Sequence, residues 1–506
     1  MKSFLITTPI PYTNAAPHIG HLLEGVYNDA IARYQRRLHD GQVNLTMGLD
    51  QHGLKIYQAA TKAGQDIQEF VNEQGQTFVD LWKQFNVQYD TWVPTTSREH
   101  YLVASLFWKR LTENGFIYKK AYTGLYNMYD EAFILAKDLD ANGDLPGRPG
   151  TKPIEMEEEN YFFKLTDFKE QLLTYLRATD IQPEGVKLEM TNFLNDELFD
   201  VSFSRERNKL PWGIPVPGDK EQVMYVWCDA LVNYATACVN LETVDRWYEL
   251  VEDREEIEQE IWNEIRQNMP IDLMYIGKDI ARFHLIYWPA MLMGVGLEAP
   301  TQVLVHGHIN ASDGRKMSKS FGNGVSPQEL LELFGVEGSR FLILHDINLF
   351  GDTNFGWNTM VESYNSHLAN NLGNLVMRVT TLVEKNFDGL IDLDDAIQLL
   401  NPESVYAAMQ NNDTREALEI ILKAGRAGNE LLEQTKPWTL IKTGKTEEAR
   451  KILTNLAGLI NDIGDLMAMF LPETGFKLRE IIQAIPMVKA EVLFIKIEKD
   501  LVLSDI

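Results

Sequence analysis

The sequence has few residues from which a covalent or metal-bound framework could be built. Its only two cysteines, Cys228 and Cys238, cannot form a disulfide framework or supply four thiolates to a metal. We expect both to be small buried side chains in a reducing compartment. The sequence also lacks the ~20 consecutive apolar residues that a membrane span requires, and the apolar stretch at its start is too short for a secretory signal. These absences predict a cytoplasmic protein without membrane association.

Basic side chains are also in short supply. The 47 Lys and Arg residues face 73 Asp and Glu residues, which gives a formal net charge of −26. This balance excludes sequence-indifferent adhesion to DNA or to an anionic membrane, so any nucleic-acid partner must be bound by local basic patches. At 506 residues, 45% hydrophobic and 24% charged, the chain is predicted to fold into several ordered domains.

The spacing of apolar residues predicts alternating strands and helices near the start of the chain. Residues 4–8 have strand character, apolar residues recur at helical spacing from Leu23 to Leu38, and residues 43–47 are again extended. The same rhythm returns at residues 222–227, 273–276 and 303–305. Together these segments predict a doubly wound parallel sheet, split into two halves, with a ligand crevice at the carboxyl ends of its strands.

Changes in composition predict the domain boundaries. Clustered Gly, Pro, Asn and Asp interrupt the alternating pattern, and beyond about Thr359 only helical patterns remain. The predicted fold class is therefore α/β, a split Rossmann-like sheet with an inserted domain, followed by an all-α helical bundle. The expected parts are residues 1–115 and 218–325 for the two halves of the sheet, 116–217 for the insertion, 326–358 for a linking region and 359–506 for the bundle.

Two histidines stand beside a glycine where the first predicted helix begins. His18, Gly20 and His21 follow the first strand directly. Free backbone N–H groups and the positive end of a helix attract phosphate, Gly20 permits close approach, and both imidazoles can donate to oxygens as negative charge develops. The alternative is that the two histidines only cap the helix or pack against it.

A second motif lies far downstream, in the glycine-flanked loop from Asp313 to Asn323. It carries Arg315, Lys316 and Lys319. Lysine charges on a loop suit a polyphosphate whose charge shifts during phosphoryl or adenylyl transfer. Alone, such a loop is as well explained by a solvated surface turn, but with the histidine motif it indicates a nucleotide site.

These two motifs, at opposite ends of a split nucleotide-binding fold, resemble the signature of class I aminoacyl-tRNA synthetases, and in detail the methionyl-tRNA synthetase family. Further matching blocks, in the expected order over almost the whole chain, are Gly48 to Gly53, Tyr225 to Ala230, Ile276 to Ile280, Phe283 to His284, and Lys436 to Trp438. The resemblance implies ATP-dependent attachment of methionine to tRNA(Met), including initiator tRNA, through methionyl-adenylate, with Mg²⁺ accompanying ATP.

The resemblance also implies roles for individual residues. The catalytic residues would be His18, His21, Lys316 and Lys319, and ATP would contact Gly20, Asp279, Lys316, Ser318 and Lys319. Methionine would be bound by Ile10, Tyr12, Asp50, Trp227, Ala230, Leu231, Tyr234, Ile280, His284 and Tyr287. Asp50 would pair with the substrate ammonium and Asp279 would accept from a ribose hydroxyl. The alternatives are that Asp50 caps the helix predicted over residues 54–63 and that Asp279 caps the helix after it.

In the helical region the resemblance implies that Asn374, Arg378 and Trp438 read the CAU anticodon by hydrogen bonding and stacking, the usual way in which single-stranded RNA is read. Asn374 and Arg378 are four residues apart, and therefore lie on one face of the predicted helix. None of the three residues alone would indicate this role. The hypothesis depends on all three matching the family at the expected positions.

The sequence departs from the family in two places. Many relatives bind zinc through Cys-x-x-Cys knuckles in the insertion, but residues 125–149 contain no cysteine, so we expect a knuckle without structural zinc. Leu231 replaces a proline found in some relatives. Some relatives dimerise through an appended C-terminal domain. The sequence stops before such a domain, so we expect a monomer. The rival hypotheses are a class I synthetase for another amino acid, a small-metabolite adenylyltransferase, and a non-catalytic tRNA-binding paralogue.

Overall fold

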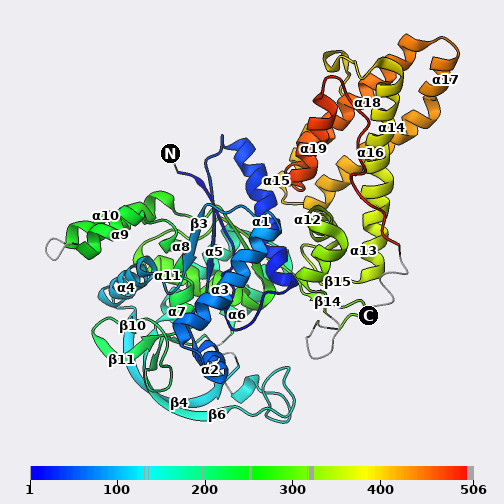
Figure 1. The fold of residues 1–506 in the computed structure, drawn as a ribbon. Coiled ribbons are helices and arrows are strands. Elements are labelled where there is room, and N and C mark those ends of the chain that lie inside the picture. The colour runs from blue at the N-terminus through cyan, green and yellow to red at the C-terminus, as the bar shows by residue number, and fades with distance from the viewer. Residues whose placement is uncertain are drawn as a thin grey trace. The chain divides into compact units, whose positions relative to one another are not determined.

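The computed structural model describes residues 2–129, 132–134, 136–196, 198–249, 254–315, 317 and 324–498. The chain forms two compact units. The first is built from the described parts of residues 1–16, 44–79 and 89–305, and the second from those of residues 17–43, 80–88 and 306–506 (Figure 1). Among the helices that the structure describes, none combines the length and the apolar character needed to cross a bilayer.

The first unit is organised around a six-stranded sheet. Its strand order is β3 (Thr91–Pro94), β2 (Val43–Leu49), β1 (Phe4–Thr7), β12 (Leu273–Gly277), β13 (Gln302–His306) and β7 (Asp180–Gln182). The pairs β2 with β3, β1 with β12, and β13 with β7 are parallel. The chain thus winds outward in both directions from β1 and β12, which confirms the predicted doubly wound sheet.

One predicted strand is wrong, and two strands of the main sheet, β3 and β7, were not predicted. Residues 222–227 do not enter the main sheet: β11 (Asp219–Met224) pairs antiparallel in a separate three-stranded sheet with β9 (Ser204–Glu206) and β10 (Pro215–Val216), and Trp227 lies in helix α7 (Val226–Ala230). In the other direction, β7 comes from the predicted insertion and forms an edge of the main sheet. A three-residue strand is too short to leave a periodic pattern in the sequence.

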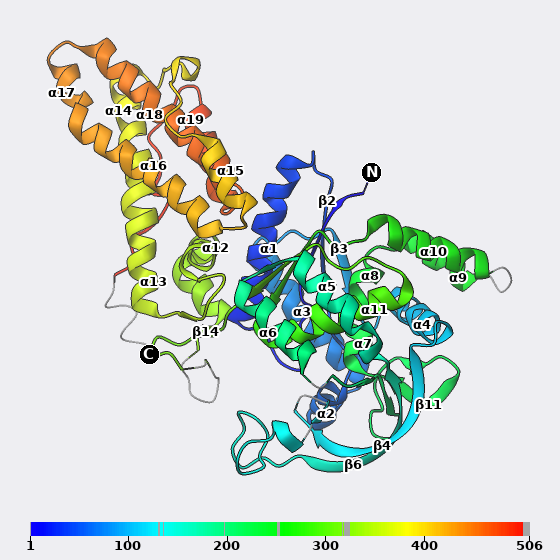
Figure 2. The same cartoon turned by 180° about the vertical axis from the view of Figure 1, so that it is seen from behind.

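A four-stranded sheet lies within residues 116–217, the predicted insertion. Its order is β5 (Ala132–Ile134), β4 (Ile117–Asn127), β6 (Ile154–Phe163) and β8 (Val201–Ser202), and its paired strands are antiparallel. It curves away at one end of the first unit, together with β11 (Figure 2). The unit also contains 3₁₀ turns at Ala136–Asp138, Leu165–Phe168 and Lys278–Ile280.

The helices of the first unit enclose one large apolar core. They are α2 (Leu54–Ala63), α3 (Ile67–Gln84, which continues into the second unit), α4 (Arg98–Glu113), α5 (Lys169–Ala178), α6 (Glu184–Asn195), α7, α8 (Asn233–Thr236), α9 (Leu241–Glu249), α10 (Arg254–Asn268), a π-helical segment (Phe283–Tyr287) and α11 (Trp288–Val295). Cys228 and Cys238 lie buried in this core, unpaired as expected. Burial raises the pKa of Cys238 to about 12, so its thiol stays protonated.

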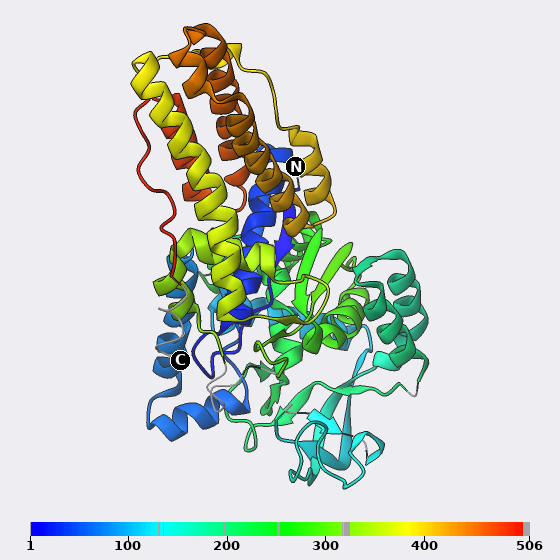
Figure 3. The ribbon, with the colours of Figure 1, turned by 90° about the vertical axis from the view of Figure 1, so that its right-hand side faces the viewer.

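The second unit is mainly helical, and its described elements beyond residue 359 are all helices or helical turns, which agrees with the predicted helical region. It contains α1 (Ile19–Leu38), α12 (Pro327–Asp346), α13 (Trp357–Tyr364), a π-helical segment (Asn365–Gly373), α14 (Asn374–Phe387), a 3₁₀ turn (Leu393–Asp395), α15 (Pro402–Gln410), α16 (Thr414–Thr435), α17 (Pro437–Lys442), α18 (Thr446–Met467) and α19 (Pro472–Gln483). A two-stranded ribbon of β14 (Ile309–Asn310) and β15 (Thr353–Asn354) joins them. The later helices run side by side as a bundle (Figure 3).

Candidate active site

The first-unit candidates gather where the strand order of the main sheet reverses. Because β1 and β12 are parallel neighbours, with Ile6 opposite Leu273, the chain leaves both strands at the same edge of the sheet. Ile10 and Tyr12 follow β1, while Asp279 and Ile280 follow β12. Such a reversal point is where open α/β sheets bind ligands.

Backbone pairing brings Asp50 beside Tyr12. The two residues form a parallel bridge, in which the N–H of Asp50 donates to the carbonyl of Pro11 (2.9 Å) and the N–H of Thr13 donates to the carbonyl of Asp50 (3.0 Å). The side chain of Asp50 is buried and its Oδ1 accepts from the N–H of His52 (3.3 Å). Helix α2 is capped by Gly53 without a side-chain bond, so the alternative that Asp50 caps this helix is wrong.

A buried carboxylate that was not singled out from the sequence supports this loop. Asp229 lies between His52 Nδ1 (2.6 Å from Oδ2) and His100 Nε2 (2.7 Å from Oδ1). Burial alone would raise the pKa of Asp229, but the charges and hydrogen bonds of the two imidazoles outweigh it and lower this pKa. The network connects helix α7, which carries Trp227, to the loop that carries Asp50.

The aromatic candidates form one connected cluster. The rings of Trp227 and Phe283 stack with centroids 3.7 Å apart, and Phe283 meets the ring of Tyr287 edge-on at 5.3 Å. Trp227 also meets His284 edge-on at 6.2 Å. Ala230 and Leu231 are buried beside Trp227 at the end of α7. Phe283 was not among the candidates, although its position four residues before Tyr287 was a usable signal.

The hydrogen bonds of His284 determine which of its ring nitrogens carries the proton. Its Nδ1 donates to the carbonyl of Ile280 (3.0 Å), because a carbonyl can only accept, and Nε2 therefore accepts from the hydroxyl of Tyr234 (2.8 Å). Burial lowers the pKa of His284 to about 4, so the ring is neutral at pH 7. The cluster of Trp227, Tyr234, Phe283, His284 and Tyr287 is an uncharged aromatic wall, suited to an apolar, polarizable side chain. We call it the aromatic wall.

Asp279 stands on the other strand of the reversal point. It is exposed, in the 3₁₀ turn after β12. Gly277 and Arg282 cap that turn and the following π-helical segment, and within the described chain neither cap uses a side chain. The alternative that Asp279 is a helix cap is therefore wrong.

In the second unit, His18 and His21 form the N-terminus of α1. The N–H of Gly20 donates to Nδ1 of His18 (3.1 Å), the N–H of His18 donates to Nδ1 of His21 (3.2 Å), and the two rings stack at 3.7 Å. The two histidines therefore do cap helix α1, as the alternative hypothesis proposed. This capping does not exclude anion binding: with both Nδ1 atoms accepting, each neutral ring carries its proton on Nε2 as a donor. Burial, and secondly the nearness of the His18 imidazole, hold the pKa of His21 well below its usual value.

The lysine motif lies mostly outside the described residues. Lys316, Ser318 and Lys319 are among the residues that the structure does not describe. On one side of them the guanidinium of Arg315 pairs with Asp313 (2.6 Å), and on the other α12 begins with Ser326 as its cap. The predicted convergence of these lysines with the histidines therefore stays a prediction.

A buried ion pair joins α1 to α12. The guanidinium of Arg340, fully buried on α12, donates to Asp29 of α1 (2.6 Å) and to the carbonyls of Phe85 (3.0 Å) and Phe470 (2.8 Å). Asp29 also accepts from Arg33 (2.8 Å). The helix headed by His18 is thus fixed to the helix that follows the lysine motif.

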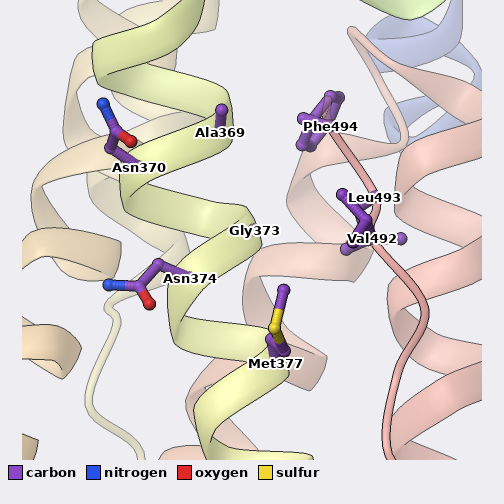
Figure 4. Close-up of a pocket in the computed structure, with 8 residues that line it drawn as sticks. All are labelled: Ala369, Asn370, Gly373, Asn374, Met377, Val492, Leu493 and Phe494. Atoms are coloured by element: carbon purple, nitrogen blue, oxygen red, sulfur yellow. The ribbon is translucent and has the colours of Figure 1, made fainter. Parts of the chain in front are cut away.

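Two of the three anticodon candidates are in contact. The guanidinium of Arg378 lies 5.6 Å from the ring centre of Trp438 and pairs with Glu433 (2.6 Å). Asn374 is exposed one turn earlier on α14 and lines a hollow of about 310 Å³ between this helix and residues 492–494 (Figure 4). Arg378 and Trp438 together offer a stacking surface with a cation, as readers of unpaired bases require.

Comparison with known proteins agrees with this arrangement. A model of the family "tRNA synthetases class I (M)" matches residues 4–143 and 148–380. The methionine–tRNA ligase of Clostridium acetobutylicum is 38% identical over 94% of this chain and 73% of its own length. The chain belongs to the methionyl-tRNA synthetase family. The family enzyme of Brucella melitensis is 34% identical over 96% of this chain and 92% of its own length.

A solved structure of the family matches throughout. Methionyl-tRNA synthetase of Mycobacterium tuberculosis, bound by methionyl-adenylate, has a TM-score of 0.83 and 33% identity, covering 95% of this chain and 94% of its own. These matches favour the methionine enzyme over a synthetase for another amino acid and over a small-metabolite adenylyltransferase.

The knuckle in the insertion is held by protein groups. Oδ1 of Asp140 accepts from the N–H groups of Asn142 and Asp144 (both 2.8 Å), and Asp144 accepts from the N–H of Gly150 (2.7 Å) and pairs with Lys152 (2.8 Å). These bonds lower the pKa of Asp144, chiefly through Lys152. The residues present, carboxylates and a lysine, do not make a thiolate zinc site.

Proposed function

We propose that this chain ligates methionine to tRNA(Met) in two steps. The methionine carboxylate attacks the α-phosphorus of ATP, the bond to the bridging oxygen breaks, and pyrophosphate leaves. A hydroxyl of the terminal ribose of tRNA(Met) then attacks the carbonyl carbon and AMP leaves. The first step needs no general base because the nucleophile is already ionised at neutral pH.

The observation that carries this proposal is the aromatic wall, placed at the reversal point of the sheet with Asp50 at the same edge. The wall is neutral and apolar, which suits a thioether, and the carboxylate of Asp50 would pair with the substrate ammonium. Ile10, Tyr12, Ala230, Leu231 and Ile280 would complete this site. Selectivity would come from shape, since one methylene gives only about 1–3 kcal/mol of discrimination.

We assign catalysis of the first step to positioning and charge stabilisation. The Nε2–H donors of His18 and His21, with Lys316 and Lys319, would stabilise the charge that develops on the phosphates. Gly20, Asp279 and Ser318 would hold the rest of ATP, which enters with Mg²⁺.

For the remaining parts, residues 116–217 would be the connective insertion, 326–358 would contact the acceptor stem, and 359–506 would read the anticodon through Asn374, Arg378 and Trp438. Initiator tRNA would be a substrate, and the chain would act as a cytoplasmic monomer.

The proposal is tested by ATP–pyrophosphate exchange measured with each amino acid in turn. Methionine should support exchange and the others should not. Lys319→Ala should lower the methionine-dependent rate about 100-fold or more, with little change in methionine affinity. Arg315→Ala is the matched control, since that guanidinium is already paired with Asp313. Exchange with another amino acid, or none with methionine, would contradict the function, and a wild-type rate in Lys319→Ala would contradict the role of the lysine.

A further inference from the structure

We propose that His345, His367 and Glu419 form a binding site for one divalent transition-metal cation of the Zn²⁺ class. The three residues come from three elements of the second unit: His345 from the end of α12, His367 from the π-helical segment after α13, and Glu419 from α16. The site is distinct from the methionine and nucleotide residues, and it does not rest on the proposed function.

The geometry is close to that of a three-ligand site. The potential ligand atoms of the three side chains all lie within 4.8 Å of one another, and Nε2 of His345 lies 2.8 Å from Oε1 of Glu419. A zinc ion about 2.0–2.2 Å from each ligand holds neighbouring ligand atoms about 3.3–3.5 Å apart. Binding of an ion would therefore have to draw the more distant ligand atoms closer together.

The surroundings of His345 orient it as a ligand. Its Nδ1 lies 2.5 Å from Oδ1 of Asp346, and the same oxygen accepts from the hydroxyl of Ser363 (2.9 Å). In metal sites a carboxylate that accepts from one ring nitrogen fixes the tautomer and turns the other nitrogen toward the ion. Here that other nitrogen is Nε2, which faces Glu419.

The position of His367 favours a bound metal ion over a shared proton as the explanation of this cluster. A protonated His345 bridging Asp346 and Glu419 would explain two of the contacts without any ion. It leaves His367 unexplained: this half-buried ring lies 4.9 Å from the ring of His345, and within the described chain no hydrogen bond to its nitrogens is found. A shared cation gives all three side chains a common partner. His367 also sits in a π-helical segment, a geometry frequently found at functional sites.

Ligand type indicates the class of cation. Arg426 donates to Oε2 of Glu419 (3.0 Å) and so leaves Oε1 for the ion. The carboxylates of Glu419 and Asp346 are balanced by two guanidinium groups, that of Arg426 and that of Arg415, which donates to the carbonyls of His345 (2.6 Å) and Asp346 (2.7 Å). Two nitrogen ligands and one oxygen suit Zn²⁺, Co²⁺ or Ni²⁺ rather than Mg²⁺ or Ca²⁺.

The test uses the full chain, freed of metal with a chelator. Zn²⁺ binding is measured by titration calorimetry, and Co²⁺ binding by its visible absorption. We expect one ion per chain, with affinity at least tenfold lower in His367→Gln and in Glu419→Gln, and about 10–100-fold lower in Asp346→Asn. Arg426→Leu, which removes the competing cation, should bind more tightly. His39→Gln, at an exposed histidine that ends α1, is the matched control and should bind as the parent does.

Zn²⁺ should also raise the melting temperature of the parent and of His39→Gln, but not that of His367→Gln. Circular dichroism checks that each variant is folded. If a ligand variant does not fold, Asp346→Asn, which keeps all three ligands, is used in its place. Absence of binding by the parent would overturn the proposal. So would equal binding by the parent and His367→Gln, because the ion would then lie elsewhere in the chain.

Discussion

At the residue scale, the direction of a single proton determines what the aromatic wall offers a ligand. His284 donates its one N–H to the carbonyl of Ile280, so the hydroxyl of Tyr234 must donate to the other ring nitrogen of His284. The wall is therefore uncharged, and the hydroxyl proton of Tyr234 is already engaged within it. A ligand with a polar side chain would gain little there, whereas a thioether loses nothing by leaving water.

The same residue gives a pH prediction. The pKa of His284 is about 4 in the folded chain and about 6.5 when the chain is unfolded, so between these values the unfolded state binds the extra proton. Stability contributed by the neutral ring is complete above about pH 6.5 and is lost as the pH falls towards 4. Between pH 7 and pH 5 the parent should lose about 2 kcal/mol more unfolding free energy than His284→Gln, measured with urea. Parallel losses would refute this assignment.

His18 combines two functions that substitution can separate. His18→Asn keeps a good helix cap but removes the Nε2–H donor, whereas His18→Ala removes both. We expect His18→Asn to unfold like the parent and His18→Ala to lose about 0.5–2 kcal/mol, with ATP–pyrophosphate exchange strongly reduced in both. Normal exchange in His18→Asn would show that the histidine only caps.

Trp438 should matter for tRNA alone. Trp438→Ala should reduce tRNA charging, since it removes the ring that Arg378 covers, and leave methionine-dependent exchange nearly intact. Glu433→Gln is the control, because it loosens the ion pair of Arg378 but keeps the ring. If exchange fell as far as charging, the anticodon assignment would be wrong.

At the element scale, the sequence predicted the fold where a regular period was present. The helix over residues 54–63 and the strands near residues 4–8, 273–276 and 303–305 were found because each has a clear apolar pattern. The segment 222–227 misled because its apolar run suits a strand in any sheet. The two π-helical segments could not be predicted, since their extra residue per turn depends on packing and not on local preference.

The candidate site, like the fold, could be predicted from the sequence only in part. The resemblance assigned roles to four residues of the aromatic wall, but none to Phe283 and none to Asp229, whose network supports the Asp50 loop, although both residues lie in matching blocks. Buried charge pairs between distant segments leave no periodic trace. The proton positions of His18, His21 and His284 required the hydrogen bonds of the folded chain.

At the scale of the whole molecule, a chain with a net charge of −26 must fold and still accept polyanions. Within the second unit, one positive and one negative charge are enclosed together: Arg340 and Asp29 are both fully buried and fix α1 to α12. This pair is costly to break, because buried Asp29 then keeps only Arg33 as a counter-charge.

This pair can be compared with an exposed one on the same helix. Arg340→Met should lower the unfolding free energy by up to about 3–5 kcal/mol, because buried Asp29 keeps only its pair with Arg33 and the carbonyls of Phe85 and Phe470 lose their donor. Arg37→Met, which breaks the exposed pair of α1 with Asp465, should cost less than about 1 kcal/mol. Urea unfolding of both variants checks this, and equal losses would contradict the importance of the buried pair.

The knuckle closed by Asp140, Asp144 and Lys152 has a consequence for the conditions under which this insertion keeps its shape. These contacts are made by the side chains and backbone of the segment itself. Acidity, which protonates the carboxylates, and high salt, which screens the ion pair of Asp144 with Lys152, should therefore loosen it.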